Sequence, residues 1–218
     1  MKKRVAVVLS GCGVQDGSEI HEAVLTLLYL AKAGAEPLCF GLNVEQKRVV
    51  NHYNGELMGE TRNALVESAR IARGSIRDIS AANVDDLDAL VMPGGLGAAL
   101  NLSDFAVSGP TGAVHPDLRR LVESFHAAGK PIGALCIAPA TLAMILGDQG
   151  IMVTVGSEGQ TSQAIRRTGA RHQACTVDDC VVDTKHKIVT TPAYMLGPDI
   201  AHIALGIEKL CRALVDLA

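Results

Sequence analysis

The chain has 218 residues, and its 20 basic and 23 acidic side chains give a net charge of −3 without a block of like charges. Together with an aromatic content of only 3%, this charge argues against a nucleic-acid partner. No apolar run reaches the roughly 18 residues that a membrane span needs, so we expect no membrane partner either.

The first residues join a basic flank, Lys2–Arg4, to a short apolar run. This run is shorter than the apolar core of a secretory signal peptide, which has roughly 7 to 15 residues. We therefore interpret residues 4–9 as a buried strand and expect a cytoplasmic protein.

The six cysteines show no CxxC spacing. In a cytoplasmic protein this pattern argues against a disulfide framework and a structural zinc site, and we expect neither a metal nor a cofactor. Each cysteine is then a small core side chain or a reactive thiol. The apolar surroundings of Cys39 favour the core, and a structural role is favoured over a redox pair for Cys175 and Cys180. The cysteines are Cys12, Cys39, Cys136, Cys175, Cys180 and Cys211.

Strand-like and helix-like segments alternate along the whole chain, and several of the helical patterns end at a Gly. The expected strands are residues 4–9, 37–40, 76–79, 88–92, 131–135, 151–155, 180–183 and 187–191. The expected helices are residues 19–33, with Ser18 as a candidate N-cap, 61–73, 115–128, 137–146, 160–168 and 199–215. Strands separated by helices imply right-handed crossovers, so the sequence predicts a single α/β domain over residues 1–218. Its sheet is mainly parallel, with helices on both faces.

Two segments depart from this alternation. Residues 41–59 contain the hairpin signal Asn54–Gly55, which predicts a small β excursion. Residues 96–112 are rich in Gly, Ser, Asn and Ala and are long for a plain connection, so we expect a loop that could form part of a site wall.

Sheets of this kind bind ligands at the carboxyl ends of their strands. Three unusual stretches follow expected strands there: Ser10–Gly13, Pro93–Gly95 and Leu135–Ile137. We expect them to converge on one site.

Cys136 is the candidate nucleophile. It ends an apolar strand and a helix begins within two residues, which is typical of a nucleophile elbow. The N-terminus of that helix favours the thiolate over the thiol. The alternative is a buried core cysteine. This interpretation is weaker, because Cys136 lies where a strand ends and a helix begins.

Helix 19–33 offers acid and base groups for this thiol in Glu19, His21 and Glu22. A carboxyl that faces inward has a raised pKa and can carry a proton at neutral pH. A solvated carboxyl in the first turn would only complement the helix dipole, and the sequence leaves both placements open for the two glutamates.

Backbone N–H groups could complete the site. Gly94 and Gly95 allow a close approach to a substrate oxygen, and the helix start at Ile137 adds a further donor. Cys12 and Gly13 lie in a glycine-flanked loop after the first strand, where lining the pocket is favoured over a catalytic role.

Several motifs carry a family resemblance over essentially the whole chain. They are SGCGVQDGSEIHEAVLTLL, VMPGGLGAALNLSDFA, GKPIGALCIAPA, VDDCVVD and KIVTTPAYM. They resemble the PfpI-like branch of the class I glutamine amidotransferase-like superfamily, and within it the ElbB (enhancing lycopene biosynthesis) family, which is linked to glyoxalase activity. The resemblance implies a flavodoxin-like three-layer sandwich, a homodimer, a nucleophile at Cys136, a helix glutamate at Glu22 and small dicarbonyl substrates. In the family, the glutamate lies at a fixed distance before the Ala-Gly that ends the first helix. Counting back from Ala33–Gly34, this resemblance selects Glu22 over Glu19.

The chain departs from the family pattern at two places. Many relatives carry His directly after the nucleophile, where this chain has Ile137, and some carry a second His where it has Thr154–Gly156. This weakens a protease or a Cys–His dyad and leaves Glu22 as the main acid and base, helped by His21. The tail 190–194 has no His-x-Glu pair, so we do not expect glutamine hydrolysis.

The sequence therefore predicts a glutathione-independent glyoxalase, formally a hydro-lyase, that converts glyoxal or methylglyoxal to the hydroxy acid. One alternative is a redox-sensing or chaperone-like regulatory protein in which Cys136 is oxidised. Another is an amidotransferase-like accessory protein of isoprenoid biosynthesis.

Overall fold

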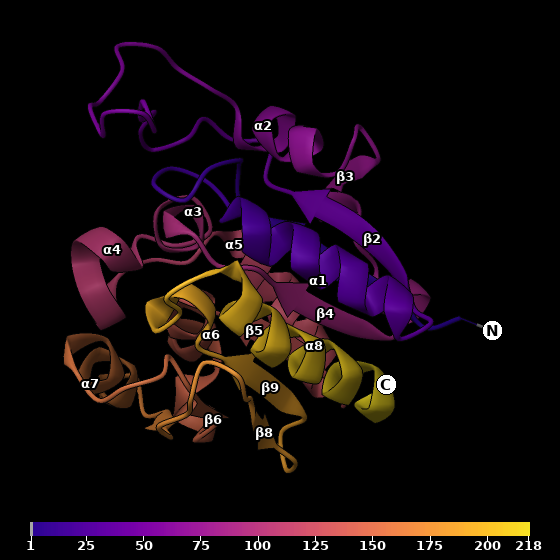
Figure 1. Cartoon of the computed structure of the whole chain (residues 1–218). Coiled ribbons are helices and arrows are strands. Elements are labelled where there is room, and N and C mark those ends of the chain that lie inside the picture. Colours follow the sequence, from indigo (N-terminus) through magenta and orange to yellow (C-terminus); the bar gives the residue numbers. More distant parts are fainter. Residues whose placement is uncertain (1) are drawn as a thin grey trace.

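A computed structural model describes residues 2–218, in which helices cover both faces of a central sheet (Figure 1). The main sheet has seven strands in the order β3-β2-β1-β4-β5-β9-β8, all parallel except β8, which pairs antiparallel with β9. The predicted three-layer α/β fold with a mainly parallel sheet is confirmed. The strands of this sheet are β1 (Arg4–Leu9), β2 (Glu36–Gly41), β3 (Ile76–Asp78), β4 (Ala89–Met92), β5 (Ile132–Leu135), β8 (Val181–Asp183) and β9 (Ile188–Thr191).

The helices form two layers. α1 and α8 lie side by side on one face (Figure 1), and α5 and α6 pack on the other. The helices are α1 (Ile20–Lys32), α2 (Ala64–Ile71), α3 (Leu96–Leu100), α4 (Phe105–Ser108), α5 (Pro116–Ala127), α6 (Ala138–Leu146), α7 (Gln160–Arg167) and α8 (Ile200–Leu217). Within residues 2–218, no helix combines the length and the apolar character that crossing a membrane requires.

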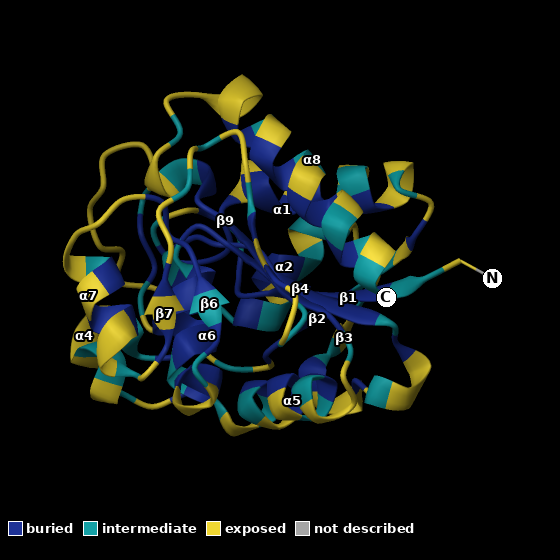
Figure 2. Cartoon of the chain, turned by 90° about the horizontal axis from the view of Figure 1, so that it is seen from below, coloured by how far each residue is buried: buried dark blue, intermediate teal, exposed yellow. Residues whose placement is uncertain are grey.

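The uninterrupted apolar run of β1 follows from its central position. Val5, Val7 and Leu9 pack in the core under α1 and α8, whereas Ala6 and Val8 pack in the core with α5 and α6. Successive side chains of a strand point to opposite faces, so a strand covered on both sides is apolar at every position. Figure 2 shows this buried sheet between helices whose outer faces are exposed.

Three expected elements differ from the structure. Residues 41–59 form a turn with an isolated antiparallel bridge between Val50 and Leu57, too short to count as strands. The expected strand 151–155 is the short β6 (Met152–Val153), which pairs with β7 (Arg171–His172) in a separate two-stranded sheet. The expected loop 96–112 instead contains α3 and α4.

The small residues of α3 allow its first turn to lie close to the loop after β1. Gly97 donates its N–H to the carbonyl of Gly17 at 2.9 Å, and a Cβ at Gly97 would lie only 2.6 Å from that residue's carbonyl carbon. The first turn of α3 therefore packs directly against the loop after β1. This contact joins the segments that follow β1 and β4. Two of the three stretches expected to converge, Pro93–Gly95 and Leu135–Ile137, meet where Gly94 packs against Cys136.

Candidate active site

Cys136 occupies a strained turn between β5 and α6. Its φ of 59° lies in the left-handed region, which costs a non-glycine residue about 1–2 kcal/mol. The Cys136 N–H donates to the carbonyl of Thr191 at the end of β9, at 3.1 Å, and so ties the turn to the neighbouring strand. The residue is only 8% exposed, so the turn is almost entirely covered by its neighbours.

Glu22 reaches this turn from the first turn of α1. Of the two placements that the sequence leaves open, the structure has the buried one, with no exposed surface. Its Oε2 accepts the N–H of Gly94 at 3.0 Å and its Oε1 accepts the N–H of Tyr194 at 3.1 Å. Burial raises the pKa of Glu22 to about 8, although hydrogen bonds from Tyr194, Cys136 and Gly94 lower it. Glu22 is therefore a protonated acid at neutral pH.

Glu19 caps the N-terminus of α1. Its Oε2 accepts the N–H of Glu22 at 2.7 Å, which makes Glu19 the N-cap of α1. The N-cap expected at Ser18 is wrong, because Ser18 is fully buried and its Oγ accepts the N–H of Ser10 at 2.8 Å. Capping by Glu19 fixes the first turn of the helix and with it the backbone of Glu22.

Burial and three neighbouring groups act on the ionisation of the Cys136 sulfur. Burial and the charge of Glu22 raise the pKa of the thiol, and the N–H groups of Gly95 and Ile137 lower it. The helix start at Ile137 acts in the expected direction, towards the thiolate, but burial outweighs both donors and the pKa of the thiol is raised. A protonated Glu22 changes this balance, since it carries no charge and can donate to the sulfur. Cys136 and Glu22 thus act as one coupled pair.

The two glycines after β4 differ in what they contact. A Cβ at Gly94 would lie 2.4 Å from the Cβ of Cys136, and its N–H is already bound by Glu22. Gly95 has a φ of 91°, and a Cβ there would lie 2.3 Å from the nitrogen of Glu19. Both positions therefore require glycine, and the Gly95 N–H faces the sulfur.

We expect Gly94→Ala to lose both stability and the function of Cys136. The added methyl group has no space and displaces the Cys136 turn or the Glu22 carboxyl, at a cost of about 1–3 kcal/mol. Thermal unfolding and the alkylation rate of Cys136 measure the two effects. Gly59→Ala is the matched control, because nothing lies within 4 Å of a Cβ at that position. A Gly94→Ala protein with the parent's melting temperature and thiol reactivity would contradict this placement.

His21 and Tyr194 lie beside Glu22 at the surface. Nδ1 of the exposed His21 is 2.8 Å from the hydroxyl of Tyr194, and the two rings are 5.9 Å apart. Sequence reasoning missed Tyr194 because its contact with Glu22 is made by a backbone N–H, which no side-chain pattern reveals.

Cys12 and Gly13 face another part of the molecule. Cys12 is half-buried, and burial followed by the charge of Glu67 on α2 raises its pKa. A Cβ at Gly13 would lie 2.5 Å from the ring of His52, in the 41–59 turn. These two residues therefore lie in the loop between β1 and Glu19, where the charge of Glu67 acts on Cys12 and Gly13 packs against His52 of the 41–59 turn.

Cys175 and Cys180 are half-buried, and burial raises the pKa of each to about 11. Both thiols therefore stay protonated at neutral pH. Among residues 2–218, no three His, Cys, Asp or Glu side chains are grouped to hold a metal ion.

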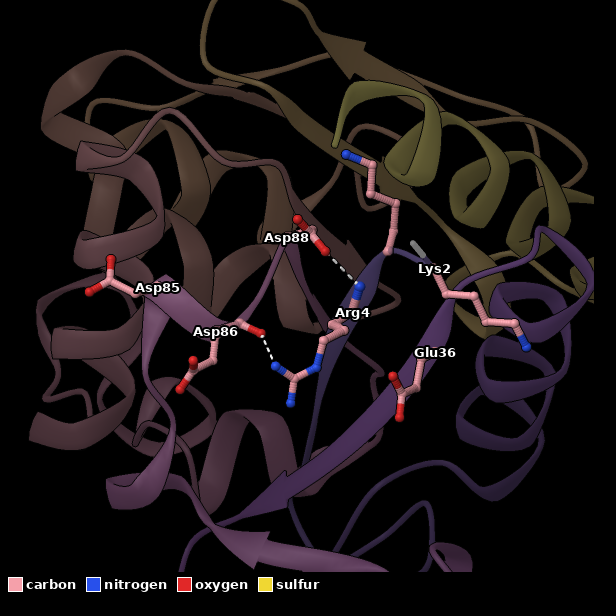
Figure 3. Close-up of a pocket in the computed structure, with 7 residues that line it drawn as sticks. Lys2, Arg4, Glu36, Asp85, Asp86 and Asp88 are labelled. Atoms are coloured by element: carbon pink, nitrogen blue, oxygen red, sulfur yellow. Dashed lines mark hydrogen bonds between the residues drawn. The ribbon is translucent and has the colours of Figure 1, made fainter.

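A hollow of about 780 Å³ lies at the opposite, amino-terminal end of the strands (Figure 3). Two of its charged side chains bind backbone groups: the Asp88 carboxylate accepts the backbone N–H of Arg4 at 2.8 Å, and the Arg4 guanidinium donates to the backbone carbonyl of Asp86. None of the candidate site residues named above lines this hollow. The lining residues are Lys2, Lys3, Arg4, Glu36, Asp85, Asp86 and Asp88.

Comparison with known proteins identifies the family. No family model matches the chain. A human protein, glutamine amidotransferase-like class 1 domain-containing protein 3, mitochondrial, is 46% identical over 224 residues, which cover 98% of this chain and 83% of the human protein. The chain belongs to the class I glutamine amidotransferase-like family.

Two further relatives extend this assignment. The rat ES1 protein homolog, mitochondrial, is 43% identical over 99% of this chain and 84% of its own length. The crystal structure of an isoprenoid biosynthesis protein with an amidotransferase-like domain, from Ehrlichia chaffeensis, is 40% identical. It covers 99% of this chain and 100% of its own, with a TM-score of 0.92. Drosophila DJ-1beta, at 21% identity and a TM-score of 0.55, shares the fold.

The expected cytoplasmic location is contradicted by these amidotransferase-like relatives, since the human and rat proteins are both named as mitochondrial. The expectation was based on interpreting residues 4–9 as a strand. That strand is present as β1, but a buried strand folds in the same way in any compartment and therefore identifies none.

Proposed function

We propose that this chain is a glutathione-independent glyoxalase of the ElbB type, with Cys136 as the nucleophile and Glu22 as the proton carrier. One observation carries the proposal: the fully buried carboxyl of Glu22 lies beside a cysteine on a strained strand-to-helix turn, and burial raises the pKa of this carboxyl to about 8. Strongly shifted pKa values and backbone strain both concentrate at functional sites. The low exposure of Cys136 favours a substrate as small as glyoxal.

The first step forms a covalent adduct. When the pair holds one proton, on Glu22, the Cys136 sulfur adds to an aldehyde carbon of glyoxal and forms a C–S bond. The aldehyde oxygen takes the proton of Glu22, which leaves a hemithioacetal and a carboxylate. The N–H groups of Gly95 and Ile137, which face the sulfur, are the backbone donors closest to the forming alkoxide.

The second step moves hydrogen between the two carbons. The Glu22 carboxylate removes the hydrogen from the sulfur-bearing carbon, and the electron pair moves to the second carbonyl oxygen, giving an enediolate. Glu22 returns the proton to the second carbon, and the hydroxyl proton passes to the neighbouring oxygen. One carbon is thereby oxidised and the other reduced, leaving a glycolyl thioester on Cys136.

Water completes the reaction. It adds to the thioester carbon, the C–S bond breaks, and glycolate leaves. One proton of the water restores Glu22 and the other goes to solvent, so that the sulfur returns as the thiolate. Methylglyoxal gives lactate by the same sequence.

The direct test is the release of glycolate from glyoxal, followed by NMR without added thiol. We expect one glycolate for each glyoxal consumed. Cys180→Ala, which changes a half-buried thiol elsewhere, should match the parent. Glyoxal loss without glycolate, as in simple modification of the protein, would refute the proposal.

A role in isoprenoid biosynthesis is the second candidate, favoured by the name of the Ehrlichia chaffeensis protein of matching fold. It predicts that isoprenoid content in cells responds to Cys136→Ala even where glyoxal turnover in vitro is absent. Measuring both quantities on the same variant separates the two functions.

We further propose that the chain is a homodimer that pairs through α1. The outer face of this helix is apolar: Ile20, Val24 and Leu28 are 42%, 48% and 44% exposed, and their spacing of four places them in one row. An exposed apolar row of this kind is typical of an interface. A twofold axis at Val24 would pack the row against its own copy, so a second chain is the occupant that matches it.

We expect Val24→Lys to convert the dimer to a monomer, since it places a charge at the centre of the row on both copies. Light scattering after size-exclusion chromatography measures the mass. Val66→Lys on α2 is the control, because Val66 is 61% exposed and lies outside the row. A parent protein that is already monomeric, or a dimer that survives Val24→Lys, would contradict this interface.

A further inference from the structure

One short segment contacts both members of the catalytic pair. This segment, residues Thr191–Leu196, begins at the last residue of β9 and is the first part of the connection to α8; it is called the 191–196 turn below. The carbonyl of Thr191 accepts the N–H of Cys136 at 3.1 Å, and the N–H of Tyr194 donates to Oε1 of Glu22 at 3.1 Å. The position of the turn therefore sets the nucleophile and the acid relative to each other.

The turn is strained at its centre. Ala193 is fully buried and has a φ of 45°, in the left-handed region that is unfavourable for any residue with a Cβ. Cys136, to which the turn is bonded, is strained in the same way. Strained backbone of this kind persists only where surrounding contacts hold it in place.

The side chain of Tyr194 supplies such a contact. Its hydroxyl lies 2.8 Å from Nδ1 of His21, which directly precedes Glu22 on α1. Burial, followed by the charges of Glu19 and Glu22, raises the pKa of Tyr194, so the hydroxyl keeps its proton and donates to His21 in the tautomer whose Nδ1 carries no hydrogen. Tyr194 thus holds Glu22 with its backbone and the neighbouring residue of the same helix with its side chain.

We propose that Tyr194 is a positioning residue for Glu22, and that its hydroxyl bond to His21 holds the Tyr194 N–H against the carboxyl. The proposal rests on the proposed function, since it assigns a cause to the geometry of that site. The N–H bond from Tyr194 lowers the pKa of Glu22. Loss of the hydroxyl bond frees the turn and weakens this N–H bond, so the pKa of Glu22 rises. The carboxyl then holds its proton to a higher pH and lies less well aligned with the sulfur.

The test compares Tyr194→Phe and His21→Leu, which both remove the bond, with His21→Asn, whose side-chain oxygen can still accept from the hydroxyl. The readout is the infrared band of the protonated Glu22 carboxyl, identified by its absence in Glu22→Gln and titrated against pH. In the parent its midpoint should lie at about 8. Loss of one hydrogen bond should raise the midpoint by about half a unit to one unit in the first two variants and leave it unchanged in His21→Asn. Tyr53→Phe, at a fully exposed tyrosine, is the control.

Glyoxal turnover measured on the same proteins separates this inference from the proposed function. Misalignment of the acid should lower kcat about tenfold in Tyr194→Phe with KM little changed. A shifted midpoint supports the positioning role even if the parent releases no glycolate, in which case only the glyoxalase proposal fails. An unshifted midpoint in both Tyr194→Phe and His21→Leu, in proteins that melt like the parent, overturns the inference.

Discussion

Cys136→Ala should release no glycolate from glyoxal and should fold as the parent does. The substitution removes the sulfur that forms the covalent adduct and keeps the Cβ, so the strained turn and its bond to Thr191 remain. Loss of one buried atom costs about 1 kcal/mol of unfolding free energy. Glycolate NMR measures the activity and thermal unfolding measures the stability.

Cys39→Ala is the matched control for this variant. Cys39 lies in β2 and is 9% exposed, close to the value for Cys136, and burial raises its pKa to about 11. The same atom is removed at the same degree of burial, so the loss of stability should be similar while the activity is kept. If Cys136→Ala still produced glycolate at the parent's rate, covalent catalysis by this residue would be excluded.

The fold could be predicted from the sequence because the strands are covered on both faces. Runs such as residues 5–9 and 89–92 are apolar at every position, and the helical patterns between them have clear ends. The structure of residues 41–59 is less predictable than that of the buried strands. Asn54–Gly55 indicates a turn but does not show how many residues pair on either side of it. β6 has strand-like residues, and its pairing with β7 instead of the main sheet depends on tertiary contacts that the local pattern does not contain.

The members of the site were predictable to different degrees. Cys136 has a local signature, because strand, turn and helix follow one another within a few residues. The burial of Glu22 was not predictable in the same way, since Glu19 has a similar setting and instead caps the helix. Whether a carboxyl at a helix start faces in or out depends on what packs above it, here Gly94 and Tyr194.

The ionisation of the site was the least predictable property. A helix N-terminus after a cysteine is visible in the sequence and lowers a thiol pKa, but the degree of burial is not visible and acts in the opposite direction. In this structure burial dominates for both Cys136 and Glu22. An attacking thiolate therefore depends on sharing one proton between the two groups, which makes Glu22 part of the nucleophile's own activation.

This dependence gives Glu22→Gln two large effects, the first on catalysis. Glutamine can still donate a hydrogen bond to the sulfur but cannot accept the carbon proton. We expect glycolate release to fall by about 100-fold or more, while iodoacetamide still alkylates Cys136. Equal losses of turnover and alkylation would show that Glu22 serves only to ionise the thiol.

The second effect of Glu22→Gln is on stability, and it has a definite sign. Folding raises the pKa of Glu22 from an ordinary value of 4.5 to about 8, so between these pH values the folded state binds more protons than the unfolded state. The unfolding free energy contributed by this group must therefore fall as pH rises, by a few kcal/mol in total. Glutamine has no proton to lose, so the variant should gain stability over the parent from pH 5 to pH 9. Denaturant unfolding at both pH values measures the difference, with exposed Glu36→Gln as the control. Parallel pH dependence in parent and variant would mean that the Glu22 carboxyl is not held protonated by its burial, and the proton-sharing pair would lose its physical basis.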